Sequence, residues 1–174
     1  MSHEKAKMDS HTCEVQDRQW LTLAQLPRFS VAKLGAILRD NKLQIADLFS
    51  ADLAFLLRSG FSDIQAQCLL HPNMQQLENS MLWCQQPNHV LLNITSEYYP
   101  KVLLQTARPP LLLYCAGNKR LLNNPQLAIV GSRNPSVAGK QNAKYFAQAL
   151  SLSGWTVTSG LALGIDGLAH EAVL

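Results

Sequence analysis

Two short apolar runs on either side of one helical segment constrain the fold of this 174-residue chain most strongly. Residues 127–130 and 155–158 have the composition of strands, and residues 136–153 between them carry apolar side chains at helical spacing. Gly154 ends the helical segment. A strand, a helix and a strand within about thirty residues make a βαβ unit, in which the two strands are parallel. The pattern therefore predicts part of a parallel sheet.

Two further apolar runs lie upstream, at residues 89–94 and 111–115. Continuous runs of this kind suit strands that are covered on both faces, so we assign them to the same sheet. A doubly wound sheet usually has five or six strands. This chain reaches about four before it stops at Leu174, inside a helix that should start near Asp166. We expect an α/β fold with an incomplete, truncated Rossmann-like doubly wound parallel sheet over residues 89–174.

The residues before this sheet have the pattern of short helices. Apolar side chains recur at helical spacing, and helix-breaking residues fall where such helices should end (Pro27, Gly60, Pro72). Ser50 and Ser62 are candidate N-caps, because a serine hydroxyl can accept a hydrogen bond from a free N–H group in the first turn. We expect a small helical module at residues 18–88. Residues 1–17 lack periodicity and are predicted to form a disordered tail.

The overall composition is that of a globular protein, with 47% hydrophobic and 16% charged residues. The longest apolar runs are too short to span a bilayer, and the N-terminus lacks a signal-peptide core. We expect a soluble, cytoplasmic protein without a membrane-spanning segment. The four cysteines are widely spaced and form no CxxC pair, which indicates reduced thiols and no metal site.

Positive charge is concentrated in the C-terminal part of the chain. Residues 101–174 contain seven Lys or Arg and two acidic residues, whereas residues 1–100 contain eight Lys or Arg and ten acidic residues. Such an imbalance is typical either of a solvated face or of a surface that binds an anionic partner.

Two glycine-containing loops each follow a predicted strand and each lead into a helix. They span residues 131–136 and residues 159–167. Ligands bind at the carboxyl ends of the strands in an open parallel sheet, where helix N-termini offer free N–H groups suited to phosphate. Arg133 adds a guanidinium that can bind a phosphate with two hydrogen bonds.

Standard nucleotide-binding motifs do not fit these loops. Gly139 and Lys140 resemble the end of a P-loop, but Asn134 stands where that loop needs glycine and Gln141 where it needs Ser or Thr. The second loop reads GxxxGxxG rather than GxGxxG. Neither an NTPase nor an NAD enzyme is supported, and we expect no cofactor.

Both loops resemble motifs of a known family. Residues 128–133 read AIVGSR and are followed by Ser136, and residues 159–170 read SGLALGIDGLAH. These segments resemble the "AIVGSR…S" and "SGxAxGIDxxAH" segments of the DNA-processing protein A (DprA/Smf) family. Upstream, Tyr99-Pro100 and residues 109–118 resemble the "YP…PPxLYxxGN" segment of its Rossmann-like domain. The helical module is similar in kind to the SAM-like domain of the family, although residues 26–30 lack the glycine of a helix-hairpin-helix turn.

The resemblance implies a protein that binds single-stranded DNA and loads a RecA-type recombinase during natural transformation, without covalent chemistry. It implies a homodimer in the full-length family. Carried over by motif, Arg133 is the leading phosphate contact, with Gly131, Ser132 and Ser136 beside it on the first loop. On the second loop, the residues that shape the neighbouring wall are Ser159, Gly160 and Gly164.

Asp166 and His170 are assigned structural roles. Asp166 is expected to act as a helix N-cap, and His170, four residues later, shares its helix face and could hydrogen-bond to it. A catalytic dyad is the competing interpretation, but no nucleophile or metal pattern accompanies the pair. The alternative function is that of a Rossmann-like nucleotide phosphoribohydrolase of the lysine-decarboxylase-like group. Its PGGxGTxxE signature does not occur in this chain.

Overall fold

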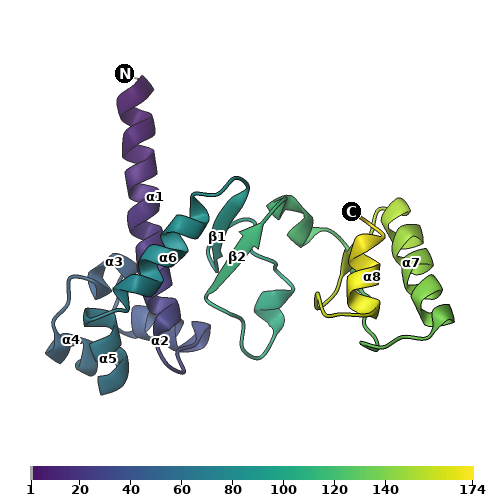
Figure 1. The fold of residues 1–174 in the computed structure, drawn as a ribbon. Helices are drawn as coiled ribbons and strands as arrows, with labels where there is room; N and C mark the ends of the chain where they lie inside the picture. Colours follow the sequence, from purple (N-terminus) through teal and green to yellow (C-terminus); the bar gives the residue numbers. More distant parts are fainter. Residues whose placement is uncertain (1) are drawn as a thin grey trace. The chain divides into compact units, whose positions relative to one another are not determined.

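The computed structural model describes residues 2–174, and the side chains of its first helix from Glu14 onward. The chain divides into two compact units at Lys119/Arg120 (Figure 1). The N-terminal unit contains the helical module and two strands, and the C-terminal unit contains two further strands and two helices. The fold is therefore mixed α/β with a helical N-terminal module, as the sequence predicted.

Within residues 2–174, six α-helices precede the first strand: α1 (Ser2–Gln25), α2 (Val31–Asp40), α3 (Ile45–Leu48), α4 (Leu53–Arg58), α5 (Asp63–Leu70) and α6 (Met74–Cys84). Their apolar faces form one core that includes Leu23, Leu34 and Leu56. Ser62 is the N-cap of α5, as predicted, and its hydroxyl accepts from the Gln65 N–H. The prediction for Ser50 was wrong, because the next helix starts at Leu53 with Asp52 as its cap.

Helix α1 includes residues that we expected to be a disordered tail. Trp20, Leu21 and Leu23 of this helix are buried in the core. Adding residues to an existing helix costs far less free energy than forming its first turn. A polar segment can therefore extend a helix whose other end is buried, although the segment has no apolar face of its own. Residues 14–18 are polar or exposed, and hydrophobic periodicity therefore gives no sign of this part of the helix.

Strands β1 (His89–Asn93) and β2 (Leu112–Ala116) occur where apolar runs were predicted, but they pair antiparallel in a sheet of their own. Leu91 lies opposite Tyr114 in this register. The assignment of these two runs to the parallel sheet was wrong. Their connection contains only a short 3₁₀ helix, η1 (Leu103–Gln105), whereas parallel neighbours are usually joined by a full crossover helix. Both strands belong to the N-terminal unit.

The C-terminal unit follows η2 (Lys119–Asn123) and has the predicted strand–helix–strand arrangement. Strand β3 (Gln126–Ala128) pairs in parallel with β4 (Thr156–Thr158), and α7 (Val137–Leu152) connects them. Helix α8 (Ile165–Glu171) follows β4 and lies beside α7 (Figure 1). Among the residues described, β3 and β4 are the only strands that pair in parallel. All three residues of β3 are exposed, so the expected cover on both faces is absent from the described part of the chain.

Across the described residues, the structure contains no helix with the length and apolar character needed to span a membrane.

Candidate nucleic-acid interface

The two predicted loops lie in contact through their backbones. The Ile165 N–H at the start of α8 donates a hydrogen bond to the Ser132 carbonyl oxygen, at 3.1 Å. Gly164 is the N-cap of α8 and has a φ of 86°, in the left-handed region that glycine adopts without strain. A Cβ atom at this position would collide with the Ser132 oxygen and would lie 2.6 Å from the Arg133 oxygen. Glycine at position 164 thus allows the loops to meet.

Gly131 allows a second close approach between the same loops. A Cβ atom at Gly131 would lie 2.7 Å from Cγ1 of Ile165, a distance that real Cβ contacts do not reach. The AIVGSR segment therefore requires a residue without a side chain at this point, which explains the glycine by packing alone.

Asp166 holds the second loop from inside α8. The prediction that it is the N-cap was wrong, because Gly164 occupies that position and Asp166 lies two residues further on. Its buried carboxylate accepts a hydrogen bond from the Gly160 N–H at 3.1 Å. An acidic side chain in the first turn also interacts favourably with the helix dipole. This hydrogen bond joins the second loop to the first turn of α8, away from the N-cap position.

The three serines of the loops are engaged in local hydrogen bonds. Ser136 is the N-cap of α7, and its hydroxyl oxygen accepts from the Gly139 N–H at 3.1 Å. The Ser132 hydroxyl oxygen accepts from the Asn134 N–H at 3.0 Å, and the Ser159 hydroxyl donates to the Ile129 carbonyl oxygen at 2.6 Å. Ser132 and Ser136 keep a hydroxyl hydrogen that a bound anion could accept, whereas that of Ser159 is already used.

His170 lies on α8 one turn after Asp166, and no hydrogen bond joins the two side chains in the described structure. Its Nε2 atom is buried and has no hydrogen-bond partner among the described residues. The C-cap of α8 is Ala172, so His170 is not a helix cap, and the hydrogen bond to Asp166 that the four-residue spacing allowed is not formed.

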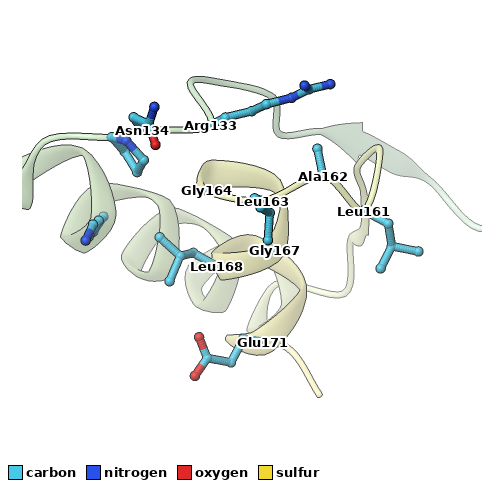
Figure 2. A pocket seen from close by; sticks show the side chains of 11 residues that line it. Arg133, Asn134, Leu161, Ala162, Leu163, Gly164, Gly167, Leu168 and Glu171 are labelled. Atoms are coloured by element: carbon cyan, nitrogen blue, oxygen red, sulfur yellow. The ribbon is translucent and has the colours of Figure 1, made fainter.

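A cavity of 600 Å³ opens beside the contact between the loops (Figure 2). Its lining comes from the first loop, the second loop and the two helices: Arg133, Asn134, Pro135, Lys140, Leu161, Ala162, Leu163, Gly164, Gly167, Leu168 and Glu171. The Arg133 side chain extends from the first loop at one end of this cavity, and Glu171 lies at the other end (Figure 2). We call this cavity the loop pocket.

The charges of the loop pocket favour an anionic ligand at its Arg133 end. The Arg133 guanidinium is exposed and forms no hydrogen bond or ion pair with any described residue. Lys140 is also exposed and unpaired within the described structure. The single acidic lining residue, Glu171, forms an ion pair with Lys144, with a distance of 3.0 Å between Oε2 and Nζ. Two uncompensated cations therefore face solvent beside two helix N-termini.

Of the predicted site residues, the structure places Arg133 and Gly164 in the lining of the loop pocket. The other five lie outside the lining, in the loops that form it: Gly131, Ser132, Ser136, Ser159 and Gly160. Sequence reasoning missed Lys140, although it comes four residues after the N-cap Ser136 and so lies one turn into α7. It also missed Leu161 and Leu163, which are 81% and 82% exposed.

Two family models match this chain. The model of DNA recombination-mediator protein A matches residues 90–174, and the model of the SMF/DprA SAM domain matches residues 16–82. The chain belongs to the DprA/Smf family. The two matches together span both units, and the resemblance of the loop motifs and of the helical module is thereby confirmed.

Relatives of this DprA/Smf chain are substantially longer than it is. Protein Smf of Escherichia coli K12 is 42% identical over 145 residues, which are 81% of this chain and 39% of that protein. DNA processing protein DprA of Bacillus subtilis is 40% identical over 45% of this chain and 27% of that protein. The X-ray structure of DprA from Streptococcus pneumoniae matches 88% of this chain and 51% of that chain, with 25% identity and a TM-score of 0.60.

Proposed function

We propose that this chain contributes a single-stranded-DNA-binding surface to a DNA recombination mediator, with the loop pocket as the phosphate-binding site. The observation that carries the proposal is the unpaired Arg133 guanidinium at the meeting point of two glycine-containing loops. The membership in a family described as DNA recombination-mediator protein A supports it.

The chemistry of the loop pocket suits phosphodiesters better than a small neutral substrate. Arg133 can donate two parallel hydrogen bonds to one phosphate, and Lys140 can neutralise a second. The hydroxyl groups of Ser132 and Ser136 are available as further donors. The exposed Leu161 and Leu163 side chains provide apolar contact area for unpaired bases beside the charges.

An anisotropy titration with fluorescein-labelled oligo-dT over a range of salt concentrations tests this site. Arg133→Gln should weaken binding roughly tenfold at low salt, because a charged hydrogen bond contributes about 1.5–3 kcal/mol and tenfold corresponds to about 1.4 kcal/mol. The slope of log K against log salt should become shallower by about 0.7, the value for one phosphate on a single strand.

The matched control is Arg58→Gln, which removes the same charge from the end of α4, far from both loops in sequence. This variant should bind oligo-dT like the unmodified chain. Unchanged affinity and slope in Arg133→Gln, or an equal loss in both variants, would remove the assignment of the loop pocket.

The remaining functional features follow from the family resemblance and are part of the proposal. We infer that the whole protein loads a RecA-type recombinase, acts as a homodimer, works in the cytoplasm and catalyses no covalent reaction. The alternative, a nucleotide phosphoribohydrolase, is not favoured by the family matches. That alternative would be favoured if the chain released a free base from a nucleoside monophosphate and if Asp166→Asn abolished this activity.

A further inference from the structure

A second cavity with cationic walls lies entirely within the N-terminal unit. It has a volume of 790 Å³ and is lined by the turn between α1 and α2 and by the segment that enters β2. From the turn come Arg28, Phe29 and Ser30, and from the segment come Arg108, Pro109 and Pro110. We call this cavity the turn pocket. It shares no residue with the loop pocket.

The turn pocket has two positive charges and no negative charge among its described lining residues. Arg28 and Arg108 are 80 positions apart in the sequence, and both are exposed. Neither guanidinium forms a hydrogen bond or an ion pair with a described residue. Two unpaired guanidiniums in the lining of one cavity favour an anionic ligand, because each can form charged hydrogen bonds with phosphate oxygens.

The wall that carries Arg28 is held in place by a buried glutamine. Gln65 is 4% exposed, and its Nε2 atom donates to the Pro27 carbonyl oxygen at 2.9 Å. Arg28 follows with a φ of 52°, a left-handed conformation that is uncommon for a residue with a side chain. The surrounding structure must hold such a conformation, which costs roughly 1–3 kcal/mol, so the Arg28 backbone is fixed before any ligand arrives.

The wall that carries Arg108 is fixed independently. The hydroxyl of Tyr99, which is 1% exposed, donates to the Pro110 carbonyl oxygen at 2.6 Å. The Ile94 N–H donates to the Leu111 carbonyl oxygen at 3.2 Å, which anchors the next residue to the end of β1. Two consecutive prolines restrict the backbone further. Both arginines therefore extend from rigid supports.

We propose that the turn pocket is a second phosphate-binding site, which takes the sugar-phosphate backbone of a single-stranded nucleic acid. The N-terminus of the ten-residue helix α2, capped by Ser30, adds partial positive charge at the same wall. Phe29 and the prolines give apolar surface beside the charges, which suits a nucleotide rather than a free inorganic anion. The choice of nucleic acid rests on the proposed function, whereas the anion site itself rests on the arginines.

The test uses the full chain and a short fluorescein-labelled oligo-dT, with Arg28→Gln, Arg108→Gln and the double variant. Each single variant should bind several-fold more weakly at low salt, and each should make the slope of log K against log salt shallower by about 0.7. The double variant should lose both contributions. An abasic oligonucleotide of the same length should show the same losses, because phosphates and not bases meet the arginines. Arg58→Gln is again the control and should leave binding unchanged.

The outcomes separate this proposal from the function of the loop pocket. If Arg133→Gln weakens binding but the Arg28 and Arg108 variants match the control, the turn pocket is not a nucleic-acid site and the proposed function stands. If the Arg28 and Arg108 variants weaken binding while Arg133→Gln does not, the turn pocket stands and the loop pocket fails. Thermal shifts with inorganic phosphate form a second arm. A phosphate-induced shift that disappears in the double variant, together with unchanged oligo-dT binding, would overturn the proposal in favour of a small phosphorylated ligand.

Discussion

Gly164 and Gly154 both have a positive φ but different surroundings. Their φ values are 86° and 83°, and a Cβ atom would meet two carbonyl oxygens at Gly164 but nothing within 4 Å at Gly154. Gly154→Ala should therefore cost only the backbone strain, about 1 kcal/mol. Gly164→Ala adds a collision inside a packed contact and should cost about 3 kcal/mol in all. Urea unfolding followed by tryptophan fluorescence measures both variants, with Trp20 and Trp83 replaced by phenylalanine so that the signal comes from Trp155 in the C-terminal unit. Equal losses would show that the loops do not depend on this contact.

Tyr99 provides a prediction that depends on pH. Burial raises the pKa of the Tyr99 hydroxyl above its ordinary value. The folded state thus holds this proton more tightly than the unfolded state, and its contribution to stability is complete below the ordinary pKa. The contribution is lost as the pH rises from that value through the pKa of the folded state. The free energy of unfolding should therefore fall at alkaline pH.

Tyr99→Phe removes that titration and the hydrogen bond to Pro110. The variant should lose about 1 kcal/mol at neutral pH, and its free energy of unfolding should fall less than that of the unmodified chain above pH 10. Tyr145→Phe is the control, since this side chain is 68% exposed. If the free energies of unfolding of Tyr99→Phe and of the unmodified chain fell equally with rising pH, Tyr99 would not be the group that causes the loss of stability.

Single residues differ in how far the sequence reveals them. Arg133 could be named because it ends the AIVGSR segment of the family; without that resemblance, an exposed arginine in a loop is as readily a simple surface residue. Asp166 was misassigned because an acidic residue near a helix start fits both the N-cap and a position inside the first turn. The choice depends on where the loop ends, and that depends on the left-handed turn at Gly164, which periodicity does not register. The DNA-binding roles of the loop residues stay predictions.

At the scale of elements, Gln65 joins two helices through one side chain. Its Oε1 atom accepts from the Lys33 Nζ on α2 at 2.6 Å and from the Ser62 N–H at 3.2 Å. Together with the bond to Pro27, these contacts tie α5 to the α1–α2 turn. Gln65→Met keeps the volume but leaves the Pro27 oxygen and the Lys33 ammonium without partners. We expect a loss of about 2–3 kcal/mol.

The measurement for Gln65→Met is urea unfolding, with Gln67→Met on the exposed face of α5 as its control. The control should differ from the unmodified chain by no more than about 0.5 kcal/mol. Gln65→Met should also weaken oligo-dT binding if the turn pocket is a nucleic-acid site, because the support of Arg28 is lost. A stable Gln65→Met variant would show that the bonds of Gln65 do not hold the turn.

Elements were predicted better than their pairing. The apolar runs gave the positions of β1, β2, β3 and β4 to within a few residues, and Gly154 marked the end of α7. An apolar run does not indicate which other strand it pairs with, because a short strand has the same hydrophobic pattern in a parallel and in an antiparallel sheet. The antiparallel β1–β2 pair therefore appeared only in the structure. The part of α1 before residue 18 was missed for a different reason, since its polar residues have no hydrophobic periodicity.

At the scale of the whole chain, the two units differ in the size of their cores. In the C-terminal unit, the buried core cluster consists of Ala147, Val157 and Ala169, all small or medium side chains. The N-terminal unit buries a much larger cluster with many leucines. Because stability grows with the apolar area that is buried, the C-terminal unit should open at lower free energy.

Native-state hydrogen exchange on the full chain tests this difference. Amides of α2, α5 and β1 should exchange slowly, whereas those of β3, β4 and α7 should exchange at rates closer to those of an unfolded chain. Uniformly slow exchange from Leu127 to Thr158 in a monodisperse monomer would contradict the expectation. The division of the chain into a helical module and a sheet region at residue 88 remains a proposal. The compact units of the structure divide elsewhere, between Lys119 and Arg120.

The contact between the loops at Gly164 has a practical consequence for engineering. Two of the bonds that fasten the second loop, from Ile165 to Ser132 and from Gly167 to Ala162, join backbone atoms, and the side chains of Asp166 and Ser159 supply two more. Leu161 and Leu163 point into solvent between these anchors, so varying their side chains should leave the anchors in place. Leu161 has a φ of 56°, which disfavours β-branched residues at this position. A combinatorial library that leaves β-branched residues out at position 161 and varies position 163 freely could therefore alter which ligands the chain prefers with little effect on folding. Diversification at 131 or 164 would instead yield mostly unfolded clones.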